Sequence, residues 1–104
     1  MVTKKDLEKV LEEVDIVFLP FKSLKGFYFP DYRLILVDYS LSKEESIKTM
    51  IHETLHDLLP NAKEDYIENL TKKLYRKKSI RDLFENYYYA LITNSLSNFL
   101  HYVD

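Results

Sequence analysis

A single short connection in the middle of the chain constrains the fold more than any other feature. Pro60-Asn61 separates two segments, residues 42–59 and residues 62–78, in which apolar residues recur at helical spacing. Proline interrupts the first helix, and so short a link leaves little room before the second helix begins. The two helices are therefore predicted to lie side by side and to run in opposite directions.

The first of these helices carries the pentapeptide His52-Glu-Thr-Leu-His56. Histidines four residues apart lie on the same side of a helix and can bind one metal ion, and Glu53 stands where a general base for water is needed. Both histidines lie beside the apolar stripe of the helix, which consists of Ile47, Ile51, Leu55 and Leu58. The helix can therefore bury one side in a core and present both imidazoles to a cleft.

The second helix offers the missing ligand. Catalytic zinc takes three protein ligands and keeps one position for water, and a chain without cysteine must supply nitrogen and oxygen. The antiparallel arrangement brings Glu64 beside His56 and Glu68 beside His52. We assign Glu64 as the third ligand and Glu68 as the carboxylate that accepts the free ring N–H of His52. The reverse assignment stays open, and His101 is a weaker rival near the C-terminus.

The rest of the chain predicts an α+β fold. Residues 3–14 have the apolar spacing of a helix, residues 15–19 have strand composition, and residues 26–29 and 33–38 flank a turn signal and predict a β-hairpin. Thr3 and Ser42 are each followed three residues later by an acidic residue, as in a capping box. The expected order is an N-terminal helix, a small sheet with a hairpin, the HExxH helix, the glutamate-bearing helix and a C-terminal helical segment.

The C-terminal segment is expected in two pieces. Ser79 with Asp82 is predicted to cap an aromatic-rich helix that ends near residues 93–95, and residues 96–102 are predicted to form a last short helical piece. The basic run of residues 72–78 is interpreted as a solvated helix end, where cations complement the helix dipole.

Composition narrows the classes of function. The chain has 104 residues, enough for one domain, and a net charge of −2 that gives no strong attraction to nucleic acid. Its apolar runs are too short to span a membrane, and its first residues lack the apolar region of a secretory signal. The sequence therefore predicts a single domain over residues 1–104 in the cytoplasm, with no nucleic-acid partner and no membrane segment.

At the metal-binding residues the chain resembles zinc-dependent peptidases of the gluzincin kind. More narrowly, it resembles the minigluzincins, small soluble proteins from thermophilic prokaryotes that are similar to the catalytic domains of certain membrane-embedded metallopeptidases. The resemblance rests on the strand at residues 34–38, on Met50-Ile-His-Glu-Thr-Leu-His56 and on Glu64-Asp-Tyr-Ile-Glu68, and it covers roughly residues 26–78. The last position departs from the gluzincin consensus, which prefers Asp.

This resemblance implies a zinc-dependent endopeptidase of minimal size. It implies that His52, His56 and Glu64 bind Zn²⁺ and that Glu53 is the general base for hydrolysis of a peptide or protein substrate by a zinc-bound water. The strand at residues 34–38 would form the rim of the cleft, where an extended peptide can add as a further strand. The resemblance also implies latency, in which residues 95–104 block the cleft from their own chain or by exchange with a second subunit in a homodimer.

Two other interpretations stay open. A domain this small has little room for a deep pocket, so the chain can also be a non-catalytic zinc-binding protein with a regulatory or interaction role. Alternatively, the motif is fortuitous in a helical adaptor, which predicts no bound metal at all.

Overall fold

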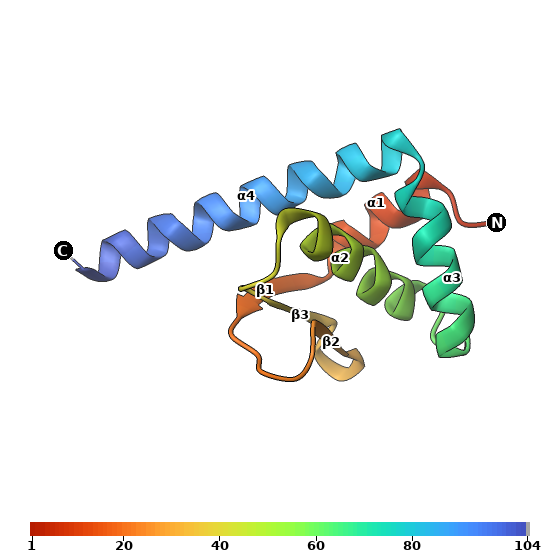
Figure 1. Ribbon diagram of the computed structural model, residues 1–104, viewed down its shortest axis with the longest axis horizontal. Helices are drawn as coiled ribbons and strands as arrows, with labels where there is room; N and C mark the ends of the chain where they lie inside the picture. The colour runs from red at the N-terminus through yellow and green to blue at the C-terminus, as the bar shows by residue number, and fades with distance from the viewer. Residues whose placement is uncertain (104) are drawn as a thin grey trace.

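The protein has an α+β fold, in which helices precede and follow a three-stranded sheet (Figure 1). The computed structural model describes the backbone of residues 1–103 and the side chains of residues 1–94. Its elements are, in order, α1 (Lys4–Glu13), β1 (Asp15–Leu19), β2 (Gly26–Phe29), the 3₁₀ helix η1 (Pro30–Tyr32), β3 (Leu34–Asp38), α2 (Lys43–Leu58), α3 (Glu64–Tyr75) and α4 (Lys78–Val103).

The first helix begins and packs as the sequence predicts. The Thr3 hydroxyl accepts a hydrogen bond from the Asp6 backbone N–H at 3.2 Å, and the Asp6 carboxylate accepts one from the Thr3 backbone N–H at 2.8 Å. This reciprocal pair is a complete capping box. The apolar stripe of α1 is buried in the core and consists of Leu7, Val10 and Leu11.

The predicted hairpin is present, but its strands belong to a sheet with a mixed arrangement. β2 and β3 pair antiparallel, with Phe27 opposite Leu36. β1 pairs with the other edge of β3 in the parallel direction, so the strand order is β1-β3-β2 and β3 is central. The turn between β2 and β3 is the 3₁₀ helix η1, followed by Arg33 in the left-handed conformation with φ 45°.

Helix α2 lies at the centre of the fold, between the sheet and the other helices (Figure 1). The Ser42 hydroxyl accepts a hydrogen bond from the Glu45 backbone N–H at 3.2 Å, which is one half of the predicted capping box. The other half is absent because the Glu45 carboxylate accepts from Lys25 Nζ at 2.8 Å. Four apolar side chains of α2 are almost completely buried, and they are Ile47, Met50, Ile51 and Leu55.

The boundaries of the last two helices differ from the predicted ones. α3 spans Glu64–Tyr75 and is shorter at both ends than the predicted 62–78. α4 already begins at Lys78 and continues to Val103, so the expected break near residues 93–95 and the separate piece over residues 96–102 are wrong. The reason is that neither glycine nor proline occurs between residues 79 and 103, and three weak helix formers in a row cost too little to end a helix. Within the described part of the chain, no helix is long and apolar enough to cross a membrane.

The two faces of the sheet differ in the exposure of their side chains. Ile35 and Val37 of β3 are completely buried on the face that α2 covers. Within residues 1–103, no helix covers the opposite face (Figure 1). On that face Val17, Leu19 and Phe27 each keep about two fifths of their surface exposed.

Candidate metal centre

Helix α2 presents both histidines of the HExxH motif on one side. The Nε2 atoms of His52 and His56 lie 3.3 Å apart, and the side chains are 22% and 27% exposed. Their neighbours toward the core, Ile51 and Leu55, are completely buried. The helix therefore divides its surface as the sequence predicts, with one side in the core and the imidazoles at the surface of a cleft.

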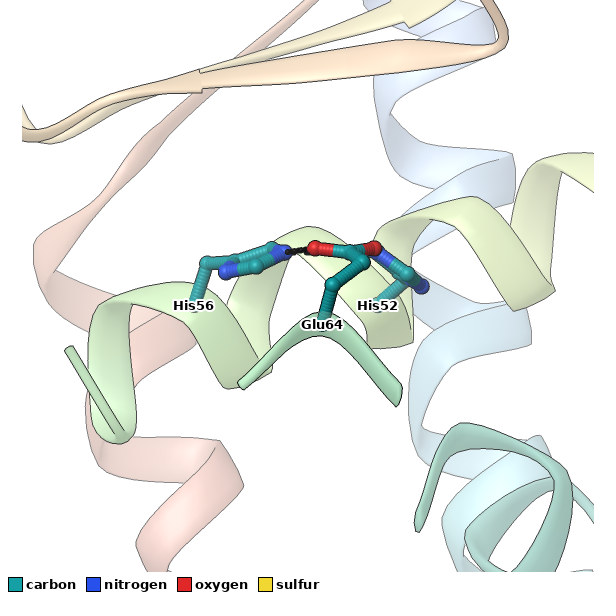
Figure 2. A group of neighbouring side chains, drawn as sticks. All are labelled: His52, His56 and Glu64. Carbon is teal, nitrogen blue, oxygen red and sulfur yellow. Dashed lines mark hydrogen bonds and ion pairs between the residues drawn. The ribbon is translucent and has the colours of Figure 1, made fainter. Parts of the chain in front are cut away.

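Helix α3 brings Glu64 directly against these imidazoles. Figure 2 shows the Glu64 carboxylate between the two rings, with Oε1 2.5 Å from His52 Nε2 and Oε2 2.9 Å from His56 Nε2. Glu64 is the first residue of α3, where the helix dipole favours a negative charge. One ligand atom from each of the three residues lies within 4.8 Å of the others, so the three side chains converge on one point.

Glu68 lies one turn further along α3 and lines the same cleft. Its side chain is exposed, and no hydrogen bond joins it to either histidine among the residues whose side chains the structure describes. The structure thus brings Glu64, rather than Glu68, to the two imidazoles. Glu68 as a partner of His52 stays a prediction. The side chain of His101, the rival ligand, lies outside the described residues.

The donor set fits a zinc ion. Two His and one Glu form a ligand set of catalytic zinc sites, and a tetrahedral ion with Zn–N bonds of about 2.0–2.1 Å places two nitrogen ligands about 3.3 Å apart. The two Nε2 atoms lie at this separation. The Glu64 carboxylate lies somewhat closer to each histidine than such an ion would allow. More than half of the Glu64 side chain is exposed, so the carboxylate has room to move away from the rings.

Glu53 is the only ionisable residue of the pentapeptide that is buried. It is 7% exposed and lines the cleft beside the histidines. Burial raises the pKa of the Glu53 carboxyl above its ordinary value; the nearby imidazoles oppose this rise and the charge of Glu64 adds to it. A carboxylate with a raised pKa is a better proton acceptor near neutral pH, as a general base requires.

The cleft in front of His52, His56 and Glu64 has a volume of about 850 Å³ and is lined by residues of α2, α3 and the edge strand β2. This corrects the expected rim. Residues 34–38 form β3, which is paired on both sides and cannot accept another strand. β2 is the edge strand, and its residues Gly26, Phe27 and Tyr28 line the cleft.

The chain's only glycine explains how β2 comes so close to α2. A Cβ atom added to Gly26 would lie 2.5 Å from Thr49 Cγ2, 2.9 Å from the Leu36 carbonyl oxygen and 3.5 Å from Glu53 Cγ. The first two distances are too short for any side chain. The sequence analysis placed Gly26 at the start of the first hairpin strand and assigned it no role, although a lone glycine within a strand is a known signal of close backbone approach.

A polar network around Asp57, which the sequence analysis did not predict, lies at one end of the cleft. The Asp57 carboxylate accepts hydrogen bonds from Arg33 and from the Tyr28 hydroxyl. Burial acts to raise the pKa of Asp57, but these hydrogen bonds outweigh it and the pKa lies below its ordinary value. Burial and the Asp57 charge raise the pKa of Tyr28 to about 12. The network joins α2, β2 and the turn before β3.

A scan against models of protein families and a search of curated proteins both gave no match for this chain.

Proposed function

We propose that this protein is a zinc-dependent metallopeptidase of minimal size. The observation that carries the proposal is the convergence of His52, His56 and Glu64 at the floor of an open cleft. The resemblance of the surrounding motif to the minigluzincins supports the same class of reaction. A purely structural zinc site is closed by four protein ligands, whereas three ligands at a cleft leave a position for water or substrate.

Each residue of the centre has a separate role in this proposal. His52, His56 and Glu64 hold the ion, and zinc bound there would lower the pKa of water and polarise the scissile carbonyl. Glu53 accepts the proton of the attacking water at its carboxylate and passes it to the leaving amine. The low exposure of Glu53 keeps bulk water away from that carboxylate and supports a raised pKa.

The edge strand supplies the place for a peptide. A substrate in extended conformation can pair with the unpaired edge of β2 through main-chain hydrogen bonds. Gly26 keeps that edge close to Glu53, so a peptide bound there would pass in front of the metal centre. Recognition through the main chain predicts broad side-chain tolerance near the scissile bond.

The decisive experiment separates metal binding from catalysis. Glu53→Gln should keep one equivalent of zinc, measured by elemental analysis, and lose cleavage of a labelled unfolded protein. His56→Ala should lose both zinc and cleavage. Full cleavage by the Glu53→Gln variant would contradict the proposed mechanism.

Latency is tested by comparing the full chain with a truncated chain, because a blocked cleft would make the full chain inactive. Truncation after Asn94 should preserve zinc binding and increase cleavage if residues 95–104 restrain the site. One equivalent of zinc with no turnover in either form would instead favour the non-catalytic zinc-binding role. Protein that is purified without chelator and contains no metal would favour the chance motif.

A further inference from the structure

The basic run of residues 72–78 contains cations that no carboxylate of the described side chains neutralises. Five of its seven residues are Lys or Arg. Lys72 lines the cleft of the candidate metal centre, and Lys78 Nζ lies 2.8 Å from the Asp82 carboxylate. The other three are exposed and form no ion pair with any side chain that the structure describes, and they are Lys73, Arg76 and Lys77.

The C-terminal end of α3 already has a different cation at its carbonyl groups. Arg81 Nη1 donates to the Tyr75 carbonyl oxygen at 2.8 Å and to the Arg76 carbonyl oxygen at 3.1 Å. The influence of a helix dipole is confined to the last turn, and Arg76 and Lys77 follow Tyr75, the last residue of α3. Stabilisation of the helix end therefore does not account for all of the exposed positive charge.

These three cations line a depression of about 390 Å³ together with apolar residues from two segments of the chain. The N-terminal segment lies beside the junction of α3 and α4 (Figure 1). Met1 is completely exposed, whereas Leu74 is only 2% exposed. Among the side chains that the structure describes, no acidic one lines the depression. We call this surface the basic patch, and its residues are Met1, Val2, Leu70, Lys73, Leu74, Arg76 and Lys77.

We propose that the basic patch docks this chain on the surface of an anionic lipid bilayer. Cations that surround an exposed apolar side chain suit such a surface, because the cations meet the lipid headgroups while the apolar group enters the boundary of the acyl chains. A soluble acidic peptide would be bound by the cations alone and would leave Met1 in water. The net charge of −2 gives the rest of the chain no general attraction to polyanions, so the binding is confined to this patch.

The number of charges predicts a weak and reversible association. Each cation near an anionic bilayer strengthens binding about fivefold, so Lys73, Arg76, Lys77 and the amino group of Met1 together contribute about 600-fold. Burial of the Met1 side chain adds roughly 10- to 100-fold. The association constant is therefore expected on the order of 10⁴ M⁻¹, comparable to that of a single myristoyl chain.

Sedimentation with lipid vesicles tests this proposal on the full chain. The chain should bind vesicles of phosphatidylcholine with about one third phosphatidylserine, and it should bind vesicles of phosphatidylcholine alone at least about 100-fold more weakly. An increase in NaCl from about 0.1 to 0.5 M should weaken binding at least tenfold. Absence of binding to the anionic vesicles at about 1 mM lipid, or equal binding to both kinds of vesicle, would overturn the proposal.

Matched removal of charge tests whether the patch itself is responsible. The triple variant Lys73→Gln/Arg76→Gln/Lys77→Gln should bind anionic vesicles about 100-fold more weakly than the wild type. The control removes the same charge from exposed residues outside the patch and should weaken binding less than about threefold. Its substitutions are Lys9→Gln, Lys22→Gln and Lys63→Gln. Equal losses in the two triple variants would overturn the assignment to the patch.

Two further measurements keep the result unambiguous. Lys77→Glu reverses one exposed charge and should weaken binding about 25-fold, which tests the patch even if the triple variant loses its fold, as far-UV circular dichroism would show. Soluble poly-glutamate that binds as tightly as anionic vesicles of matched charge would assign the patch to an acidic peptide and overturn the proposal. Vesicle binding requires neither zinc nor cleavage, because the patch and Glu64 lie at opposite ends of α3, so its failure would leave the proposed function intact.

Discussion

Asp57 and Arg33 form an ion pair with two hydrogen bonds, which joins helix α2 to the turn before β3. Arg33 Nε lies 3.0 Å from Asp57 Oδ1, and Arg33 Nη2 lies 2.7 Å from Asp57 Oδ2. The Asp57 side chain is only 7% exposed, whereas that of Arg33 is 40% exposed. Because Asp57 directly follows His56, this pair anchors the last turn of the HExxH helix against the sheet.

Removal of this carboxylate should destabilise the fold. In Asp57→Ala the Tyr28 hydroxyl and part of the Arg33 guanidinium lose their acceptor, and we expect a loss of about 1–2 kcal/mol in the free energy of unfolding. The loss stays below that of a fully buried pair because Arg33 remains part-exposed and retains Glu13 at 2.5 Å. Urea unfolding measures the difference. Asp31→Ala, on an exposed residue of η1, is the control and should change stability by less than about 0.5 kcal/mol.

Gly26→Ala should push the edge strand β2 away from helix α2. The added methyl group meets Thr49 Cγ2 and the Leu36 carbonyl oxygen, and we expect a cost of about 1–3 kcal/mol. Thr49→Ser deletes Cγ2 and should recover part of that cost in the double variant, while the contact with the carbonyl oxygen remains. A double-mutant cycle from urea unfolding measures the coupling. Strictly additive effects of the two substitutions would contradict the close approach of β2 and α2.

Zinc should stabilise the folded protein, and Glu64 should be required for the effect. Zinc at 100 times its dissociation constant adds about 2.7 kcal/mol, which corresponds to a rise of roughly 10 °C or more in the melting temperature of a domain of this size. Protein treated with chelator and then titrated with zinc in a calorimeter measures this rise. Glu64→Gln should remove most of it, whereas Glu68→Gln should retain it. The opposite pattern would assign the third ligand to Glu68.

Asp38 should make stability fall at acidic pH. Hydrogen bonds from the Ser40 backbone N–H, the Phe21 backbone N–H and the Ser40 hydroxyl lower the pKa of Asp38 below 3.8, against the opposing effect of burial. A carboxyl with a lowered folded-state pKa contributes stability above its unfolded pKa and loses it as the pH falls through the folded value. The stability difference between the wild type and Asp38→Asn should therefore be constant from about pH 7 to 5 and shrink toward pH 2. Urea unfolding across this range provides the measurement, and a difference that does not change with pH would refute the assignment.

Much of the local structure could be read from short-range patterns. The reciprocal cap at Thr3, the strand before Pro20 and the hairpin around Pro30 depend on residues within a few positions of one another, so the sequence predicts them correctly. The same applies to the orientation of His52 and His56, because their common side follows from the helical repeat. The break expected near residue 94 was wrong because weak helix formers lower helix stability without ending a helix.

The sequence by itself determined the α+β class, the helix that carries both histidines and the short link that returns Glu64 toward them. Those features depend on periodicity and link length, which a linear sequence contains. Only the tertiary structure decided that β3 is central, that β2 is the edge facing the cleft, and that Asp57 pairs with Arg33. The pairing of β1 with β3 joins residues 19 positions apart, and the Asp57–Arg33 pair joins residues 24 positions apart. Many pairings at such distance are compatible with the same local patterns. Packing of the whole chain selects one of them, because only one arrangement buries the inner face of the sheet against α2.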